Sequence, residues 1–224
     1  MPYRRTDNVI RKQIARHGAI MESARLIAAE GGMAAVQIAP VAHRAGIAAG
    51  TVYRYFPSKT ELVGALIAAI AEREIEALQR AAAAAPGPVS ALAAAIATFA
   101  ARALRNRRLA WAVIAEPVDA AIEAMRIEYR KTLAAEFRKR IEAAMAAAHV
   151  PRQDSALAAP ALVGALLEGL IGPLAPESSA DENDARAAVQ TLTLLCLRAL
   201  GVVDARARGL VVQTVLPAAE EANA

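Results

Sequence analysis

Two tyrosines and a lysine near the end of the first quarter of the chain carry groups suited to contacts with phosphate. Tyr53 and Tyr55 present phenolic hydroxyls that can donate hydrogen bonds to phosphate oxygens. Lys59 directly follows Ser58, which together with Glu61 forms the capping-box pattern of a helix N-terminus. An ammonium group in the first turn of a helix adds to the positive end of the helix dipole. These residues therefore predict contacts with a polyanion.

The charge of the chain is concentrated at the same end. Residues 1–59 contain nine Lys or Arg and three Asp or Glu, a net charge of +6, whereas the remaining residues carry −2 and the whole chain +4. A basic end on a slightly acidic body is expected where one end binds nucleic acid, and a solvated surface face is the alternative. Arg4, Arg5, Arg11 and Lys12 are expected in a disordered tail, with an arm that reaches the minor groove as the other possibility.

The composition indicates which elements position these groups. Alanine makes up more than a quarter of the chain and aromatic residues only 4%, which favours helices over strands. The apolar spacing predicts a first helix of about twenty residues ending at Gly31, short helices near 38–45 and 49–55, and a long helix from 59 to about 84. Further helices are expected at 88–105, 109–116, 118–148, 154–172, 181–200 and 204–215.

The two short helices have the spacing of a helix-turn-helix. Ala42 is small enough to let the helices cross closely, and Gly46, four residues later, can take the positive φ of the turn. Val52, six residues further on, is expected to face the core. The second short helix then begins with Ala49 and Gly50, so its N-terminal end can approach a major groove closely.

The sequence around this motif resembles the core signature of the tetracycline-repressor (TetR) family of transcriptional regulators. The resemblance rests on AGIAAGTVYRYFPSK at 45–59, on VAHR before it and TEL after it, and covers about residues 15–66. It implies an all-α fold class, with a three-helix helix-turn-helix DNA-binding domain at 1–58 and a larger helical ligand-binding and dimerisation domain at 59–224. Gln37 and Ala48 stand where the family often has capping Thr and Ser, which predicts a looser but intact motif.

The resemblance also implies roles for individual residues of the motif. Thr51, Tyr53, Tyr55 and Lys59 are implied to contact phosphates, although core packing is the alternative for Tyr55. Ala49 and Gly50 are implied to lie at the base edges, where Ala can touch a thymine methyl group. Arg44 and Arg54 are expected either to contact phosphate or to be solvated.

The body is expected to bind a small molecule and a second copy of the chain. The scarce aromatic residues and their apolar neighbours suggest a mostly apolar cavity, lined by Phe99, Trp111, Ile114, Met125, Tyr129, Leu166 and Leu170. Arg102, Glu116 and Arg126 are candidate polar anchors for a ligand. The helices at 154–172 and 181–200 are apolar on more than one face, and by resemblance they form the dimer interface, with Leu162, Leu166, Gly169, Leu192 and Leu195.

No constellation for catalysis or metal binding is expected. His17, His43 and His149 lie in separate segments without the spacing of metal ligands, and no phosphate-binding loop, dinucleotide fingerprint or G-x-S-x-G motif occurs. The single cysteine, Cys196, sits in an apolar stripe and is expected to be a core thiol. We therefore expect no catalytic residues, no metal and no cofactor.

These observations predict a cytoplasmic, homodimeric, ligand-responsive repressor that binds a palindromic operator in double-stranded DNA. The longest uncharged run, 81–101, is interrupted by Pro86 and Gly87, so no membrane span is expected. An activator or ligand-insensitive regulator of the same fold is one alternative. A helical protein-interaction module without sequence-specific DNA binding is another.

Overall fold

The computed structural model describes residues 3–117, 120–176 and 181–215, and all regular secondary structure in these ranges is helical. The all-α fold class is thereby confirmed for the described residues. The elements are α1 (Tyr3–Gly31), the short 3-10 helix η1 (Met33–Ala35), α2 (Ile38–Arg44), α3 (Ala49–Tyr55), α4 (Lys59–Ala83), α5 (Pro88–Arg105), α6 (Arg107–Ile114), α7 (Ala120–Ala146), α8 (Ser155–Leu170), α9 (Glu182–Ala199) and α10 (Asp204–Gln213).

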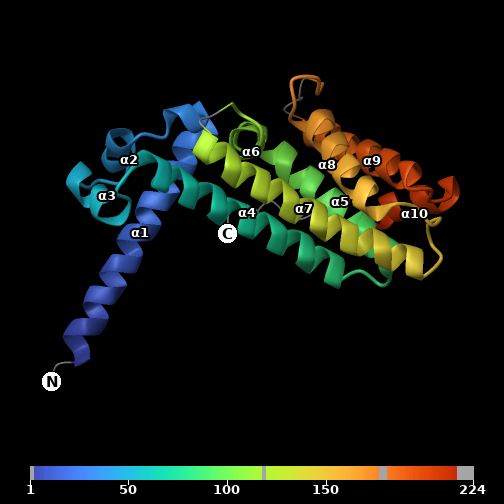
Figure 1. Cartoon of the computed structure of the whole chain (residues 1–224), viewed down its shortest axis with the longest axis horizontal. Coiled ribbons are helices and arrows are strands. Elements are labelled where there is room, and N and C mark those ends of the chain that lie inside the picture. The colour runs from blue at the N-terminus through green and yellow to red at the C-terminus, as the bar shows by residue number, and fades with distance from the viewer. Residues whose placement is uncertain (1–2, 118–119, 177–180, 216–224) are drawn as a thin grey trace.

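The first helix is longer than the sequence predicts. α1 spans 29 residues instead of about twenty, and its N-terminal half extends away from the rest of the molecule (Figure 1). Buried side chains begin only at Ile20, whereas Val9, Ile10 and Ile14 are exposed. The expectation of a disordered basic tail is wrong for residues 3–12, which are part of α1. These residues include neither Gly nor Pro, so none of them breaks the helix.

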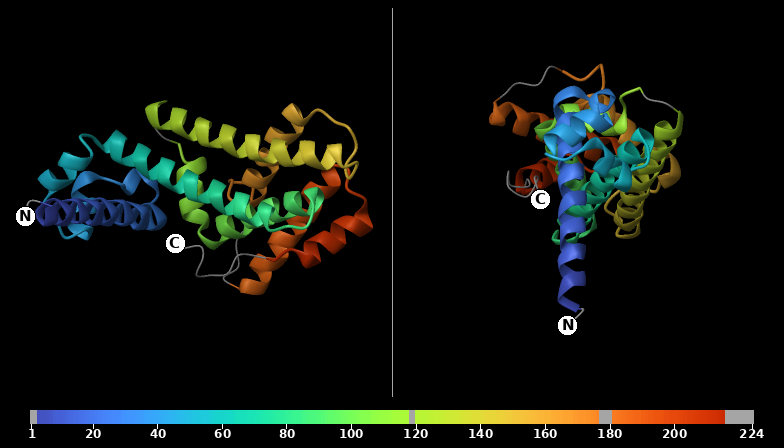
Figure 2. Two further views of the ribbon diagram at one scale, coloured as in Figure 1. Left: turned by 90° about the horizontal axis from the view of Figure 1, so that it is seen from below. Right: turned by 90° about the vertical axis from the view of Figure 1, so that its left-hand side faces the viewer.

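The body is arranged around α5. This helix packs against α4, α6, α7, α8, α9 and α10, and most of its side chains are buried on every face. Its alanines allow the neighbouring helices to approach closely, as a helix that is apolar all round requires. The long helices α4 and α7 lie side by side, while α8, α9 and α10 form the end of the body that lies far from α3 (Figures 1 and 2).

Apart from the start of α1, helix termini lie within a few residues of the predicted positions because the capping residues are local signals. Asn106, Asp154 and Asp181 each accept hydrogen bonds from backbone N–H groups in the first turn of α6, α8 and α9. α8 contains Pro160 and continues through it from Ser155 to Leu170. The buried residues form one core cluster that extends from Ile20 in α1 to Val211 in α10.

Candidate nucleic-acid interface and ligand cavity

The turn between α2 and α3 is closed by backbone hydrogen bonds and one left-handed glycine. The N–H of Ile47 donates to the carbonyl of Ala42 at 3.0 Å, and the N–H of Gly46 donates to that of His43 at 3.1 Å. Gly46 has a φ of 66°, a conformation that glycine adopts without strain. Ala42 and Val52 are both buried where the helices cross. The motif therefore has the packing that its spacing predicts.

The helices of the motif differ in how their N-termini are capped. The side chains of Gln37 and Ala48 make no capping hydrogen bond, and the Gln37 amide instead donates to the carbonyl of Ala34 at 3.0 Å. Ser58 does cap α4, because its Oγ accepts a hydrogen bond from the N–H of Glu61 at 3.1 Å. The expected loss of two caps leaves the motif intact, and the predicted capping box at the start of α4 is confirmed.

The outer face of α3 is not covered by any part of the protomer that the structure describes. Tyr53 is 53% exposed, Arg54 is also exposed, and Ala49, Thr51, Tyr55 and Lys59 are half-buried. A side chain added at Gly50 would meet no described atom within 4 Å. The Tyr55 ring lies 6.2 Å from that of His17 in α1, so it packs against α1 while remaining partly exposed. All seven candidate residues of α3 and α4 thus lie on one end of the molecule.

Arg44 is engaged within the protomer. Its two terminal nitrogens donate to the carboxylate oxygens of Glu30 at 2.8 and 2.7 Å. The hydrogen bonds from Arg44 lower the pKa of Glu30 below its ordinary value, as a bidentate guanidinium does. This pair joins the end of α2 to the last turn of α1, and it competes with any phosphate contact of Arg44.

A basic groove lies between α1 and α3. It has a volume of about 330 Å³ and is lined by Lys12, Arg16 and Arg54 together with Val9, Gln13, Thr51 and Tyr55. Sequence reasoning did not place Lys12 and Arg16 beside the motif, because it assigned Lys12 to a tail. The one available signal was their spacing of four residues, which puts two cations on one face of a continuous helix. The groove adds two cations to the predicted interface.

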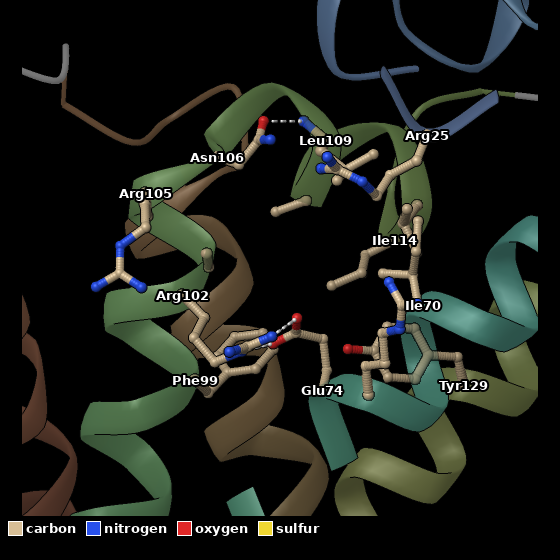
Figure 3. Close-up of a pocket in the computed structure, with 14 residues that line it drawn as sticks. Arg25, Ile70, Glu74, Phe99, Arg102, Arg105, Asn106, Leu109, Ile114 and Tyr129 are labelled. Atoms are coloured by element: carbon tan, nitrogen blue, oxygen red, sulfur yellow. Dashed lines mark hydrogen bonds and ion pairs between the residues drawn. The ribbon is translucent and has the colours of Figure 1, made fainter. Parts of the chain in front are cut away.

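A cavity of about 280 Å³ lies in the body where α1, α4, α5, α6 and α7 meet. Of the predicted ligand-binding residues, Phe99, Ile114 and Tyr129 line it (Figure 3). Trp111, Met125, Leu166 and Leu170 do not. Met125 is 39% exposed at the surface, and Leu166 and Leu170 are buried in the core on the side of α8. Which residues of a helix face the cavity depends on how the helix is rotated about its own axis. The weak apolar stripes of an alanine-rich chain do not determine this rotation.

The polar wall of the cavity is dominated by arginines that sequence reasoning largely missed. Arg102 donates from Nε and Nη2 to both carboxylate oxygens of Glu74 at 2.7 and 2.8 Å, and the pair is mostly buried. Arg25, Arg73 and Arg105 also line the cavity. Among the three proposed polar anchors, therefore, Arg102 lines the cavity and Glu116 and Arg126 do not.

Arg126 is fully buried at the contact of α6 and α7. It donates a hydrogen bond to the carbonyl of Ala112, and its Nη1 lies 3.8 Å from a carboxylate oxygen of Glu123, while Nε and Nη1 have no hydrogen-bond partner among the described residues. Burial lowers the pKa of Arg126. Glu116 instead accepts hydrogen bonds from the backbone of η1. Both residues are thus structural contacts of α6.

The predicted dimer residues are divided between the core and the surface. Leu162 and Leu166 are buried inside the protomer. Leu192 packs against Gly169, since a Cβ atom at position 169 would lie 3.2 Å from Cδ1 of Leu192. Leu195 is 56% exposed. The exposed face of α8 carries small residues instead of the predicted leucines, at Ala161, Gly164 and Ala165.

Within residues 3–117, 120–176 and 181–215, none of the helices combines the length and the apolar character that a membrane span needs. The same part of the chain contains no group of His, Cys, Asp and Glu side chains able to hold a metal ion.

The fold and the exposed motif define a class of protein: an all-α architecture with an N-terminal helix-turn-helix and a larger helical body that contains a cavity. Residues 20–66 match the family model described as bacterial regulatory proteins, tetR family. The match covers the C-terminal part of α1, then α2 and α3, and the start of α4.

Known proteins resemble the chain in two different ways. The HTH-type transcriptional repressor KstR of Rhodococcus jostii (strain RHA1) is 47% identical over 64 residues, which cover 29% of this chain and 28% of the relative. The match to the curated relatives thus spans about a quarter of their length.

Solved structures resemble the chain over nearly its whole length. RolR in complex with resorcinol is 22% identical, with a TM-score of 0.64 over 93% of this chain and 98% of that one. FadR from Bacillus subtilis in complex with stearoyl-CoA is 18% identical, with a TM-score of 0.70 over 84% of this chain and 99% of that one. At these identities the likeness shows that the body shares their fold.

Proposed function

We propose that this chain is a ligand-responsive transcriptional repressor that binds a palindromic operator as a homodimer. The observation that carries the proposal is the free outer face of α3, which begins with the half-buried Ala49 and the unobstructed Gly50 and continues to the exposed Tyr53. A helix whose first residues are this small can bring its N-terminal backbone against base edges in a major groove. The assignment as a repressor is supported by the similarity of the motif to KstR.

The phosphate contacts are assigned to the rim of this face. Thr51, Tyr53, Tyr55 and Lys59 supply hydroxyl and ammonium donors, and Lys59 lies at the N-terminus of α4 where the helix dipole adds positive potential. Lys12, Arg16 and Arg54 extend the same surface along α1. Such contacts position the protein on the duplex, while Ala49 and Gly50 are left to contact the bases.

Regulation is assigned to the cavity in the body. Its wall includes residues of α6 and also Arg25 of α1, so a ligand there touches a helix of the DNA-binding domain directly. A ligand that favours one arrangement of α1 relative to the body changes operator affinity by the ratio of its own affinities for the two arrangements. The ligand-bound RolR and FadR structures, which share the fold, support this assignment.

The proposal is tested by selecting bound sequences from random double-stranded DNA. A two-fold symmetric sequence is expected, because a homodimer presents two copies of α3. Gly50→Leu is expected to abolish binding to the selected site by filling the space that the groove needs. Gly209→Leu in α10 is the matched control, since both glycines are exposed, helical and unobstructed. No enriched sequence, or equal binding by both variants, contradicts the proposal and favours a protein-interaction module.

A further inference from the structure

The wall of the body cavity carries an excess of positive charge. Arg25, Arg73, Arg102 and Arg105 line it, against the single carboxylate of Glu74. Glu22, just outside, accepts hydrogen bonds from Arg25 Nε and Nη2 at 2.8 and 2.7 Å. The wall residues Arg25, Arg73 and Arg102 outnumber the carboxylates of Glu22 and Glu74 by one. Arg25 is half-buried and Arg73 is exposed, and a net positive charge at the cavity favours an anionic occupant over a neutral or cationic one.

The arginines do not contribute equally to this excess. Both Nε and Nη2 of Arg102 are held by Glu74, so this pair is part of the wall. Arg73 makes no hydrogen bond or ion pair with the described residues. Its positive charge contributes to lowering the pKa of Glu22. Arg25 of α1 is held by Glu22 through the same two nitrogens, Nε and Nη2, whereas Arg73 of α4 is not held in this way. An anion is therefore best placed against the guanidinium group of Arg73.

The remainder of the cavity is apolar. Ile70, Phe99, Leu109, Val113 and Ile114 supply its hydrocarbon surface from α4, α5 and α6. Its volume of about 280 Å³ lies near the lower end of the range of ligand pockets. A single ring or a short chain fits this volume, whereas an acyl-coenzyme A of the size bound by FadR does not fit it whole. The occupant is thus small and amphiphilic.

One buried polar group in the wall has no partner. The hydroxyl of Tyr129 is shielded from solvent and has no hydrogen-bond partner among the described residues, and Figure 3 shows it pointing toward Glu74 at the inner side of the cavity. Burial, together with the nearby charge of Glu74, raises the pKa of Tyr129 far above its ordinary value, so the hydroxyl keeps its proton. A buried hydroxyl is normally hydrogen-bonded, and a ligand oxygen is the partner that the cavity can supply.

We infer that the cavity binds a small organic acid with an apolar ring or short chain. Its carboxylate lies against Arg73, its hydrocarbon part lies on Phe99 and Ile114, and an oxygen at the other end accepts the hydrogen bond of Tyr129. This inference rests on the proposed function, because it names the chemical class of the effector. It also places the effector in a cavity whose wall includes Arg25 of α1, the first helix of the proposed DNA-binding domain.

The ligand class is tested by calorimetric titration of the full chain with paired probes. The acids are benzoate, phenylacetate, 4-hydroxyphenylacetate, hexanoate and octanoate, and each is compared with its uncharged amide. At least one acid is expected to bind with a Kd below about 1 mM and at least about tenfold tighter than its amide, as loss of a charged hydrogen bond predicts. Neutral resorcinol is expected to bind no tighter than the amides. No binding by any acid, or equal binding of acids and amides, overturns the inference.

Substitutions test the placement of the ligand. Arg73→Gln is expected to reduce the preference for the acid over the amide, and Arg80→Gln, two turns further along α4 in an exposed pair with Glu76, is expected to leave it unchanged. Tyr129→Phe removes only an unpartnered hydroxyl, so its melting temperature is expected to stay at that of the parent. It is expected to weaken binding of 4-hydroxyphenylacetate several-fold without affecting phenylacetate. Unchanged acid preference in Arg73→Gln overturns the placement.

DNA binding, measured separately on the selected operator, distinguishes this inference from the proposed function. If the operator is bound and the acid probes are not, the ligand class is wrong while the DNA-binding assignment stands. If acids bind with the expected charge preference and leave the operator complex intact, the ligand class stands and the regulatory role of the cavity is wrong.

Discussion

The carboxylate of Glu116, beyond the last turn of α6, accepts a hydrogen bond from the backbone N–H of Met33 in η1 at 2.7 Å. A second, longer contact joins it to the N–H of Ala34 at 3.4 Å. Gly32 has a φ of 79°, and a side chain there would lie 2.8 Å from the Glu116 carboxylate. α6 also supplies Leu109 and Val113 to the cavity wall, so one helix contacts both the cavity and the turn that precedes α2.

Replacing Glu116 with Ala is expected to destabilise the protein and to weaken the response to effector. Loss of the charged acceptor leaves the N–H of Met33 without its partner, at a cost of about 1–3 kcal/mol in the free energy of unfolding. The effector is expected to change operator affinity by a smaller factor, because α6 no longer holds η1. Chemical denaturation and operator titration with and without effector measure the two effects.

Glu128→Ala is the control for this change, since Glu128 forms an exposed pair with Lys131 on α7 and is expected to alter neither quantity. An unchanged effector response in Glu116→Ala would mean that the contact stabilises the fold without transmitting the signal.

Tyr53→Phe and Lys59→Ala are expected to weaken DNA binding on all sequences alike. Each removes a phosphate contact made once per subunit, so specificity is retained while affinity falls. For Lys59→Ala, the slope of log affinity against log salt is expected to shrink by up to about two in a dimer. The measurement is a salt titration of operator binding. Lys131→Ala, on α7, is the control, and parent-like binding by both interface variants would show that α3 is not the recognition helix.

The basic groove gives a distinct prediction for α1. The double variant Lys12→Ala, Arg16→Ala is expected to lower affinity and to reduce the salt slope by about 3–4 in a dimer, because two cations per subunit are lost. Helicity by circular dichroism is expected to stay the same. The paired substitution Lys131→Ala, Arg138→Ala removes equal charge from α7 and serves as the comparison. Equal slopes in the two double variants would exclude Lys12 and Arg16 from the interface.

The fold was largely predictable because its signals are local. The Ser58 and Glu61 cap, the left-handed Gly46 and the Ala42 to Val52 spacing each constrain neighbouring residues, and each lies as expected. The length of α1 was missed because nothing in its first residues distinguishes a solvent-exposed helix from a tail. Whether a polar segment stays helical depends on the helix propensities of its residues, which are individually weak and act only in sum.

The cavity was predictable only in part because its lining depends on helix rotation and on long-range pairing. Phe99 and Tyr129 were predicted because aromatic residues are scarce, and Ile114 as one of their apolar neighbours, and all three line the cavity. The pairing of Arg102 with Glu74 joins residues 28 positions apart in the sequence, and no local pattern predicts it. Arg25 lies in the predicted DNA-binding domain at 1–58, and only the packing of α1 against α6 brings it into the cavity wall.

Cys196 is expected to be unreactive in the folded protein. It is 2% exposed in α9, and burial raises the pKa of its thiol to about 12, so the thiolate is scarce at neutral pH. Ellman's reagent at neutral pH is expected to modify it only on unfolding.

The same shift gives a pH dependence. Since the folded pKa of Cys196 is raised, the unfolded state loses its thiol proton first, and the free energy of unfolding is expected to fall as pH rises from about 9 toward 12. Cys196→Ala is expected to lack this contribution while other groups continue to titrate. Fast modification of the native parent would show that α9 opens readily.

Assembly gives the last prediction, because a palindromic operator requires two copies of α3. Leu195 is 56% exposed on α9, and the neighbouring face of α8 carries Ala161, Gly164 and Ala165, which allow a second pair of helices to approach closely. Leu195→Glu is therefore expected to give a monomer by light scattering at micromolar concentration, with parent-like helicity and without specific operator binding. Ile127→Glu, at another exposed apolar position, is expected to remain dimeric. A Leu195→Glu protein that stays dimeric would place the interface elsewhere, and a monomeric parent would rule out operator recognition by paired α3 helices, because a single recognition helix contacts only one half-site.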